Sequence, residues 1–248
     1  MGAALRPDSA TAIKRPHPVP SPEGRPPMPA KAPRKAAVPR QRPDLSLEAG
    51  FGPGRRVCGI DEVGRGPLCG PVVAAAVVLA PEGLPPEIAA QIDDSKAVTR
   101  RLREEIEPAI RSHALAFAIA EASAAEIDEL NIHKATLLAM KRAYLALPGP
   151  APDAALVDGK FTPDIACERV AVVKGDSRSQ SIAAASILAK VARDSEMLRL
   201  SVLYPHYGWD RNAGYPTPEH LDALTRHGVT PHHRVSFAPV KRQKALSG

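Results

Sequence analysis

The apolar positions between residues 56 and 230 follow two kinds of pattern, which predict strands and helices. Short continuous apolar runs predict buried strands, at 56–67, 72–80, 114–122, 153–159 and 168–176. Apolar residues repeated at intervals of three and four predict amphipathic helices, at 99–110, 123–130, 131–147, 178–200 and 218–227. Three leading strands followed by alternating helices and strands predict one α/β domain with a mixed sheet flanked by helices.

Two local features refine this prediction. Gly64, Gly66 and Gly70 mark the turn that joins the first two predicted strands, and so short a connection predicts an antiparallel hairpin. Asp176 and Ser177 precede the longest helix and are expected to cap its first turn. The helix at 218–227 is the last one that the pattern predicts.

The first 43 residues differ in composition from the rest of the chain. They contain eleven of the 27 prolines, which remove backbone donors and oppose helix formation. We therefore expect residues 1–50 to form a disordered tail with local polyproline II character, and residues 51–248 to form the folded domain. Residues 1–43 hold nine Lys and Arg against two Asp and Glu, so the net charge of +6 comes from this tail. The tail is either an arm that increases encounters with nucleic acid or an extension without function.

Composition excludes several classes of protein. No apolar run reaches the length of a membrane-spanning helix, and the N-terminus has no apolar core of a secretory signal. The three cysteines (Cys58, Cys69 and Cys167) form no C-x-x-C pair, which favours a reducing, cytoplasmic location. Cys58 and Cys69 lie in apolar runs and are expected to be buried. The eight histidines show no spacing typical of a zinc site.

Four carboxylates lie where an acid is costly. Asp61 and Glu62 interrupt an apolar strand, Asp158 ends another, and Asp194 lies far along an alanine-rich helix. Burying an unpaired charge is unfavourable, and converging carboxylates repel one another unless a cation neutralises them. Hard oxygen ligands of this kind suit Mg²⁺ or Mn²⁺, so the sequence predicts a metal site.

The spacing of these acids leaves alternatives open. Ser186, Lys190 and Asp194 fall on one helical stripe that can point to the metal site, although Lys190 and Asp194 also have the spacing of a simple ion pair. Adjacent strand residues face opposite sides, so Asp61 and Glu62 cannot both reach one ion from a regular strand. Either a kink brings them together, or Glu62 acts through water or its main-chain carbonyl.

Two further segments carry candidate binding chemistry. Gly64-Arg65-Gly66-Pro67 directly follows the acidic pair, where glycines allow close backbone approach and arginine can bind a phosphate. The alternative is an ordinary hairpin turn. Four aromatics, including Tyr215, occur within residues 204–215, and such residues beside cations can stack on sugars or bases. For Tyr204, Tyr207 and Trp209 a small apolar core under the last helix is an equal alternative.

Five segments in order resemble bacterial ribonuclease HII. They are GIDEVGRGPLCGPVVAAAVVL (59–79), DDSKAVT (93–99), LVDGK (156–160), VVKGDSRSQSIAAASILAKVARD (172–194) and YPHYGWDRNAGYPTPEH (204–220). The resemblance implies the RNase H-like α/β fold with a helical C-terminal extension. Ribonuclease HIII usually has glutamate as its fourth acid and lacks this GRGP form, so Asp194 and GRGP favour HII.

The resemblance also implies roles for individual residues. Asp61, Glu62, Asp158 and Asp194 match the catalytic acids that bind two Mg²⁺ or Mn²⁺ ions. Gly64, Arg65 and Gly66 match the motif that recognises a ribonucleotide 2′-OH, and Tyr215 matches an aromatic that stacks on the neighbouring deoxyribose. Further matched positions lie near the phosphates or the acids: Ser95, Lys96, Ser186 and Lys190.

The implied activity is that of an endoribonuclease. It would hydrolyse the RNA strand of RNA–DNA hybrids and incise DNA 5′ of single embedded ribonucleotides, leaving 5′-phosphate and 3′-OH ends. Such an enzyme serves ribonucleotide excision repair and RNA primer removal. We expect a monomer with no membrane partner. A sliding clamp stays open as a partner, although the basic C-terminal KRQK contains no clear motif for one. The alternatives are a noncatalytic nucleic-acid-binding protein and a DNA nuclease or recombinase of the same fold.

Overall fold

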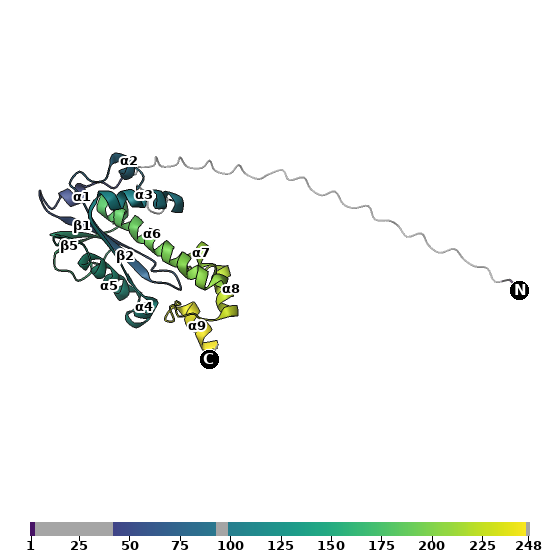
Figure 1. The fold of residues 1–248 in the computed structure, drawn as a ribbon. Helices are drawn as coiled ribbons and strands as arrows, with labels where there is room; N and C mark the ends of the chain where they lie inside the picture. Colours follow the sequence, from purple (N-terminus) through teal and green to yellow (C-terminus); the bar gives the residue numbers. More distant parts are fainter. Residues whose placement is uncertain (3–41, 93–98, 247–248) are drawn as a thin grey trace. The chain divides into compact units, whose positions relative to one another are not determined.

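The computed structural model describes residues 1–2, 42–92 and 99–246 (Figure 1). The chain divides into two units, residues 1–39 and 40–248, and the fold below is that of the second. Its strands are β1 (Val57–Val63), β2 (Val72–Leu79), β3 (Ala114–Ala122), β4 (Ala154–Asp158) and β5 (Glu168–Val172). Its α-helices are α1 (Ser46–Ala49), α2 (Pro86–Ala89), α3 (Arg100–His113), α4 (Ala124–Leu130), α5 (Ile132–Leu145), α6 (Gln180–Leu203), α7 (Trp209–Asn212), α8 (Pro218–His227) and α9 (Ala238–Leu246).

The five strands form one mixed sheet in the order β3-β2-β1-β4-β5. Strands β1 and β2 form the predicted antiparallel hairpin, and β2 pairs antiparallel with β3. Strands β1, β4 and β5 are parallel to one another. Because parallel strands end at the same edge of a sheet, the residues that close β1 and β4 are brought together.

Helices cover the sheet on two sides, as predicted for an α/β domain. On one side, α5 packs against β1 and against every second residue of β2. The residues of this cluster include Cys58, Ile60, Val72, Ala74, Ala76, Val78, Met140 and Tyr144. On the other side Val73, Ala75 and Val77 pack against α3 and the small residues of α6. Helix α6 approaches β1 so closely that a Cβ on Gly59 would lie 2.2 Å from the main-chain carbon of Ser181. Only glycine fits there, and this contact fixes α6 along the strand that carries the acids.

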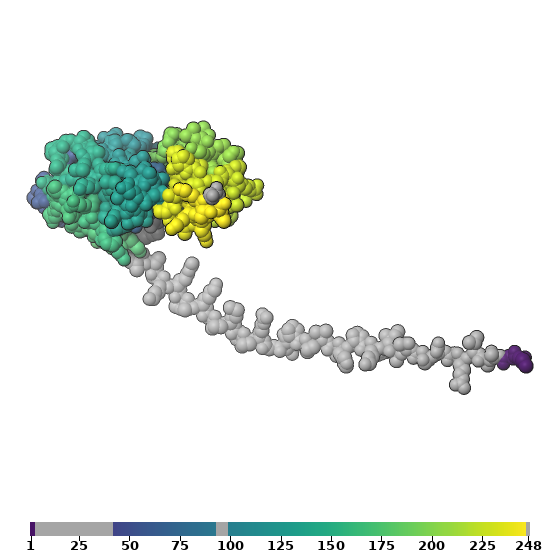
Figure 2. Space-filling model, turned by 90° about the horizontal axis from the view of Figure 1, so that it is seen from below, coloured from purple at the N-terminus to yellow at the C-terminus, as the bar shows by residue number. Residues whose placement is uncertain are grey.

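The C-terminal helices gather at one end of the domain, visible in yellow in Figure 2. Tyr207 and Trp209 are buried there with Cys69, Met197 and Leu200 in a separate apolar cluster. The small apolar core that was one of two interpretations for these aromatics is therefore present. Among the described residues, no helix is both long enough and apolar enough to cross a membrane.

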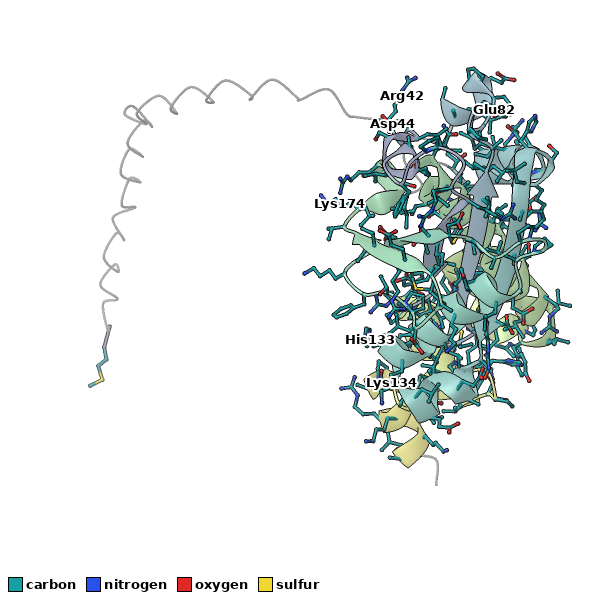
Figure 3. The ribbon with its side chains drawn as sticks, turned by 90° about the vertical axis from the view of Figure 1, so that its left-hand side faces the viewer. Arg42, Asp44, Glu82, His133, Lys134 and Lys174 are labelled. Carbon is teal, nitrogen blue, oxygen red and sulfur yellow. The ribbon has the colours of Figure 1, made fainter. Side chains whose placement is uncertain are left out.

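The structure corrects the predicted elements in three places. Residues 44–50, expected to belong to the disordered tail, contain α1, and Asp44 (Figure 3) pairs with Ser179 through a parallel bridge. Helix α6 is capped by Ser179, whose hydroxyl accepts from Ile182 N–H, because residues 175–177 form a separate 3₁₀ turn ahead of it. Helix α9 follows α8, which the pattern had made the last helix. The rest of the predicted tail, residues 3–41, lies outside the described residues.

Candidate active site

Three carboxylates converge at the edge of the sheet where β1 and β4 end. One oxygen each from Asp61, Glu62 and Asp158 lies within 4.8 Å of the others. Asp61 and Glu62 occupy consecutive positions of a regular ladder with β2. Glu62 is the last residue but one of β1, so its longer side chain reaches the same point from the end of the strand. The side chain of Glu62 therefore joins the cluster without a kink in the pairing.

Asp61 and Asp158 are held in place by hydrogen bonds. Asp61 is buried and accepts a hydrogen bond from Glu62 N–H at 2.7 Å, and the nearby Ser186 hydroxyl of α6 lowers the pKa of its carboxyl. Asp158 Oδ1 accepts from Gly175 N–H at 2.6 Å. Burial is the main reason that the pKa of each carboxyl is raised, and the neighbouring acids raise the pKa of Asp61 further. Negative charge on these three acids is therefore unfavourable unless a cation compensates it.

Glu62 provides a direct test of whether a cation fits. Its Oε1 accepts from Arg65 at 3.2 Å, whereas its Oε2 is buried and has no hydrogen-bond partner among the described residues. Burial raises the pKa of Glu62, and Arg65 opposes this shift. A buried carboxylate oxygen without a partner, beside two further carboxylates, matches the oxygen-rich site of a hard divalent cation. The residues present therefore fit such an ion.

Asp194 lies outside this cluster. Its carboxylate forms ion pairs with Lys190, one turn earlier on α6, and with Arg103 of α3 at 3.7 Å. The i, i+4 ion pair that was the alternative interpretation of Lys190 and Asp194 is thus present. Ser186, on the same helical stripe, does reach the acids through Asp61. Ser95 and Lys96 lie outside the described residues.

The glycine–arginine loop, which we define as residues 64–71, runs from the acids toward the C-terminal helices. Gly64 adopts a positive φ of 95°, which favours glycine. The Arg65 side chain is half exposed, and Gly66 lies under the partly exposed ring of Tyr215. Main-chain hydrogen bonds from Leu68 N–H to Gly214 O and from Gly70 N–H to His232 O, at 2.8 and 2.9 Å, attach the loop to the C-terminal part.

Two buried arginines behind this loop were missed by the sequence analysis. Arg193 and Arg234 are both fully buried and donate hydrogen bonds to carbonyls of the loop. The helical spacing of α6 places Arg193 in line with the buried residues Ala189 and Met197, which is a signal that the sequence contains. No local pattern marks Arg234, because its partners are distant in the sequence.

Two histidines also acquire a structural role that their spacing did not indicate. His220 Nε2 accepts from Trp209 Nε1 at 3.1 Å and lies 3.2 Å from His233 Nε2. His220 Nδ1 lies 2.9 Å from the main-chain oxygen of Tyr215. Thr230 N–H donates to His233 Nδ1 at 3.0 Å. These bonds make both rings neutral members of a buried network that ends at Tyr215.

Comparisons with known proteins agree with this arrangement. The family model for Ribonuclease HII matches residues 58–240. Ribonuclease HII of Paramagnetospirillum magneticum is 56% identical over 198 residues, which cover 80% of this chain and 96% of that protein. Ribonuclease HII of Dechloromonas aromatica is 54% identical over 206 residues, covering 82% of this chain and 99% of that protein.

Solved structures share the fold. Ribonuclease H2 from Pyrococcus horikoshii superposes with a TM-score of 0.67 at 24% identity, covering 77% of this chain and 98% of that one. Ribonuclease HII in the PCNA complex from Archaeoglobus fulgidus superposes with a TM-score of 0.58 at 26% identity, covering 73% of this chain and 95% of that one. Since the family model spans most of the folded unit and the two bacterial relatives are more than half identical over at least 80% of the chain, this chain belongs to the ribonuclease HII family and is an endonuclease of the ribonuclease H type.

Proposed function

We propose that this enzyme hydrolyses the RNA strand of RNA–DNA hybrids and incises duplex DNA on the 5′ side of a single embedded ribonucleotide. The observation that carries the proposal is the convergence of Asp61, Glu62 and Asp158 directly before the glycine–arginine loop. Acids that hold a cation account for phosphodiester hydrolysis, and a backbone loop beside them accounts for selection of a ribose. Water rather than the 2′-OH attacks, so the products carry a 5′-phosphate and a 3′-OH.

The acids are proposed to hold two divalent cations, Mg²⁺ or Mn²⁺. When bound, these ions supply positive charge that polarises the phosphate and makes water more acidic. The buried Oε2 of Glu62, which has no partner among the described residues, and the raised pKa of the Asp61 carboxyl both favour uptake of a cation by these acids. Asp194 is proposed as the fourth acid, which requires that its carboxylate exchange Lys190 or Arg103 for the ion.

The glycine–arginine loop and Tyr215 are proposed to recognise the substrate. Main-chain groups of Gly64, Arg65 and Gly66 would bond the 2′-OH, which distinguishes RNA from DNA at one site. The Tyr215 ring, which is 45% exposed, would stack on the adjacent deoxyribose. Ser186 and Lys190 border the acids on α6, where they would orient an acid and contact phosphate, and Ser95 and Lys96 are proposed as further phosphate contacts.

We further propose that the enzyme acts as a cytoplasmic monomer in ribonucleotide excision repair and primer removal. A structural neighbour from Archaeoglobus fulgidus was solved as a complex with PCNA. The present chain has no clear clamp-binding motif at its C-terminus.

The test compares two labelled duplexes that differ by one ribonucleotide, each incubated with Mg²⁺ or Mn²⁺. The expected result is a single cut 5′ of the ribonucleotide and no cutting of the all-DNA duplex. Equal cutting of both duplexes would show a DNA nuclease. Absence of cutting with retained binding would show a noncatalytic binding protein.

Asp158→Asn tests the role of the acids in the same assay. It removes one negative charge, while the amide oxygen can still accept from Gly175 N–H. Turnover should fall at least a thousandfold and binding of the duplex should survive. Activity within tenfold of the unmodified enzyme would refute a metal-binding role for Asp158.

A further inference from the structure

We propose that Arg234 and Arg193 are positioning residues that hold the glycine–arginine loop in the conformation that reads a ribose. The inference rests on the function proposed above for that loop. Both arginines are buried and contact carbonyls of the loop, so both would act through the backbone of residues 64–71.

Arg234 binds the loop along much of its length. Its Nε and Nη2 donate to Gly70 O at 3.0 and 2.8 Å, and Nη1 donates to Pro67 O at 2.8 Å. Nη2 also donates to Gly64 O at 2.6 Å, and Nη1 to Arg65 O at 3.2 Å. A guanidinium is planar with its donors in a fixed fork, so these bonds fix the loop carbonyls relative to one another.

These bonds determine where the neighbouring N–H groups point. In a trans peptide the C=O of one residue and the N–H of the next are directed oppositely. Because Gly64 O and Arg65 O face Arg234, the N–H groups of Arg65 and Gly66 face away from it. Among the described residues, neither N–H donates a hydrogen bond. Two adjacent donors without partners, held by one buried side chain, are suited to bind a single hydroxyl group.

Arg193 secures the same loop from α6. Its Nε donates to Pro71 O at 3.2 Å and its Nη2 to Cys69 O at 3.3 Å. Its Nη1 donates to Ala213 O at 3.1 Å, which joins the loop to the segment that carries Tyr215. A Cβ on Gly64 would lie 2.2 Å from Arg193 Nε, so the glycine at this position makes room for the arginine.

Both arginines are buried and depend on these contacts to compensate their charge. Each side chain is 0% exposed, and neither forms an ion pair with a carboxylate among the described residues. Burying a charge without a counter-ion is unfavourable unless hydrogen bonds compensate, and here the compensation comes from backbone carbonyls. Burial, followed by the charge of Arg193, lowers the pKa of Arg234 to about 9, which leaves it charged at neutral pH. Lysine in either position would keep the positive charge but lose the planar, forked set of N–H donors that binds several carbonyls at once.

The test measures binding rather than cleavage, in protein that carries Asp158→Asn. Affinity is measured for the duplex with one ribonucleotide and for the all-DNA duplex, with and without Arg234→Lys. We expect Arg234→Lys to weaken binding of the ribonucleotide duplex about tenfold and to leave the all-DNA affinity within twofold. Titration with Mn²⁺ alone, in protein with Asp158 intact, should show unchanged affinity, because the acids are not in contact with Arg234.

Three outcomes separate this inference from the function on which it rests. If Asp158→Asn alone does not prefer the ribonucleotide duplex, the proposed function of the loop fails. If the preference exists and Arg234→Lys keeps it, the positioning role is overturned. Arg226→Lys, on the exposed face of α8, is the matched control and should keep the preference. If Arg234→Lys does not fold, Arg193→Lys decides the question, and a retained preference then contradicts the inference.

Discussion

The ring of Tyr215 lies directly against Gly66: a Cβ at position 66 would be 3.3 Å from Tyr215 Cε1. These two residues come from the first hairpin and from the C-terminal part of the chain. The contact places a partly exposed aromatic ring next to the N–H groups of Arg65 and Gly66, which have no hydrogen-bond partner within the described part of the chain. Recognition of a ribose and stacking on its neighbour are therefore proposed to occur at one continuous surface.

The first prediction concerns Tyr215. Tyr215→Ala should lower kcat/KM on the single-ribonucleotide duplex roughly tenfold to a hundredfold, since aromatic stacking contributes about 1–3 kcal/mol. Tyr215→Phe keeps the ring, so its kcat/KM should remain within threefold of that of the unmodified enzyme. Steady-state kinetics on one duplex compare both variants, and a similar loss in both would assign the effect to the hydroxyl instead of stacking.

The second prediction concerns the charge of the acidic cluster. The pKa values of Asp61, Glu62 and Asp158 are raised in the folded state, mainly by burial. A raised carboxyl pKa means that folding binds protons, so stability without metal should fall as the pH rises above the ordinary carboxyl values. Divalent ions should reverse this loss, and the gain in Tm should be larger at pH 8 than at pH 5.

Thermal unfolding in EDTA and in Mn²⁺ at several pH values tests this expectation. Asp158→Asn removes one of the repelling charges and should raise the Tm in EDTA by about 2–4 °C, the shift expected for roughly 1 kcal/mol in a domain of this size. It should also reduce the gain from Mn²⁺. His233 contributes the opposite pH dependence below pH 6.5, so the comparison is between the unmodified protein and Asp158→Asn, in which that contribution is the same. An identical dependence of Tm on pH in the two proteins, in EDTA from pH 5 to 8, would contradict the assignment.

The third prediction concerns Asp194, which lies outside the group of three acids. Asp194→Asn should leave Mn²⁺ binding at that group within about threefold, as measured by calorimetry. Activity should nevertheless fall at least a hundredfold if Asp194 is the fourth acid. Activity near that of the unmodified enzyme would show that the ion pairs with Lys190 and Arg103 are its whole role.

The fourth prediction concerns acid stability. Burial, together with the nearby His220, lowers the pKa of His233 to about 3, from an ordinary 6.5. The unfolded state therefore binds a proton at His233 at a higher pH than the folded state does. The contribution of His233 to the free energy of unfolding is present above pH 6.5 and is lost as the pH falls toward 3. His233→Gln should flatten the stability profile in that window, measured by urea unfolding. His113→Gln, at an exposed helix end, serves as the control and should leave the slope unchanged.

The fifth prediction concerns the N-terminal tail. Deletion through residue 50 would remove α1, whose Glu48 accepts from Ser179 Oγ at 2.7 Å and from Ser181 N–H at 3.0 Å. Deletion of residues 2–41 avoids this damage and removes eight of the Lys and Arg residues. Binding to duplex should weaken mainly at low salt, with a shallower salt dependence. An unchanged slope would favour an extension without function.

Much of the fold was predictable because its signals are local. The apolar run at 72–80 and the glycines around 64–70 predicted the β1–β2 hairpin, which the structure confirms. The start of α6 was misplaced because Asp176 and Ser177 are good caps by residue type, yet they belong to a 3₁₀ turn. Helix α9 was missed because its apolar periodicity is weak and only Val240 is buried.

The sequence by itself determined which residues are candidates for the chemistry: acids placed in apolar elements are costly, and a glycine–arginine motif directly follows two of them. The tertiary structure decided how those residues are joined. It brought Glu62 to Asp61 and Asp158 at the strand ends, paired Asp194 with two cations, and placed Arg234 behind the loop. Hydrogen bonds from a buried arginine to distant carbonyls depend on chain topology, not on neighbours in the sequence. Such contacts therefore leave no local pattern to read.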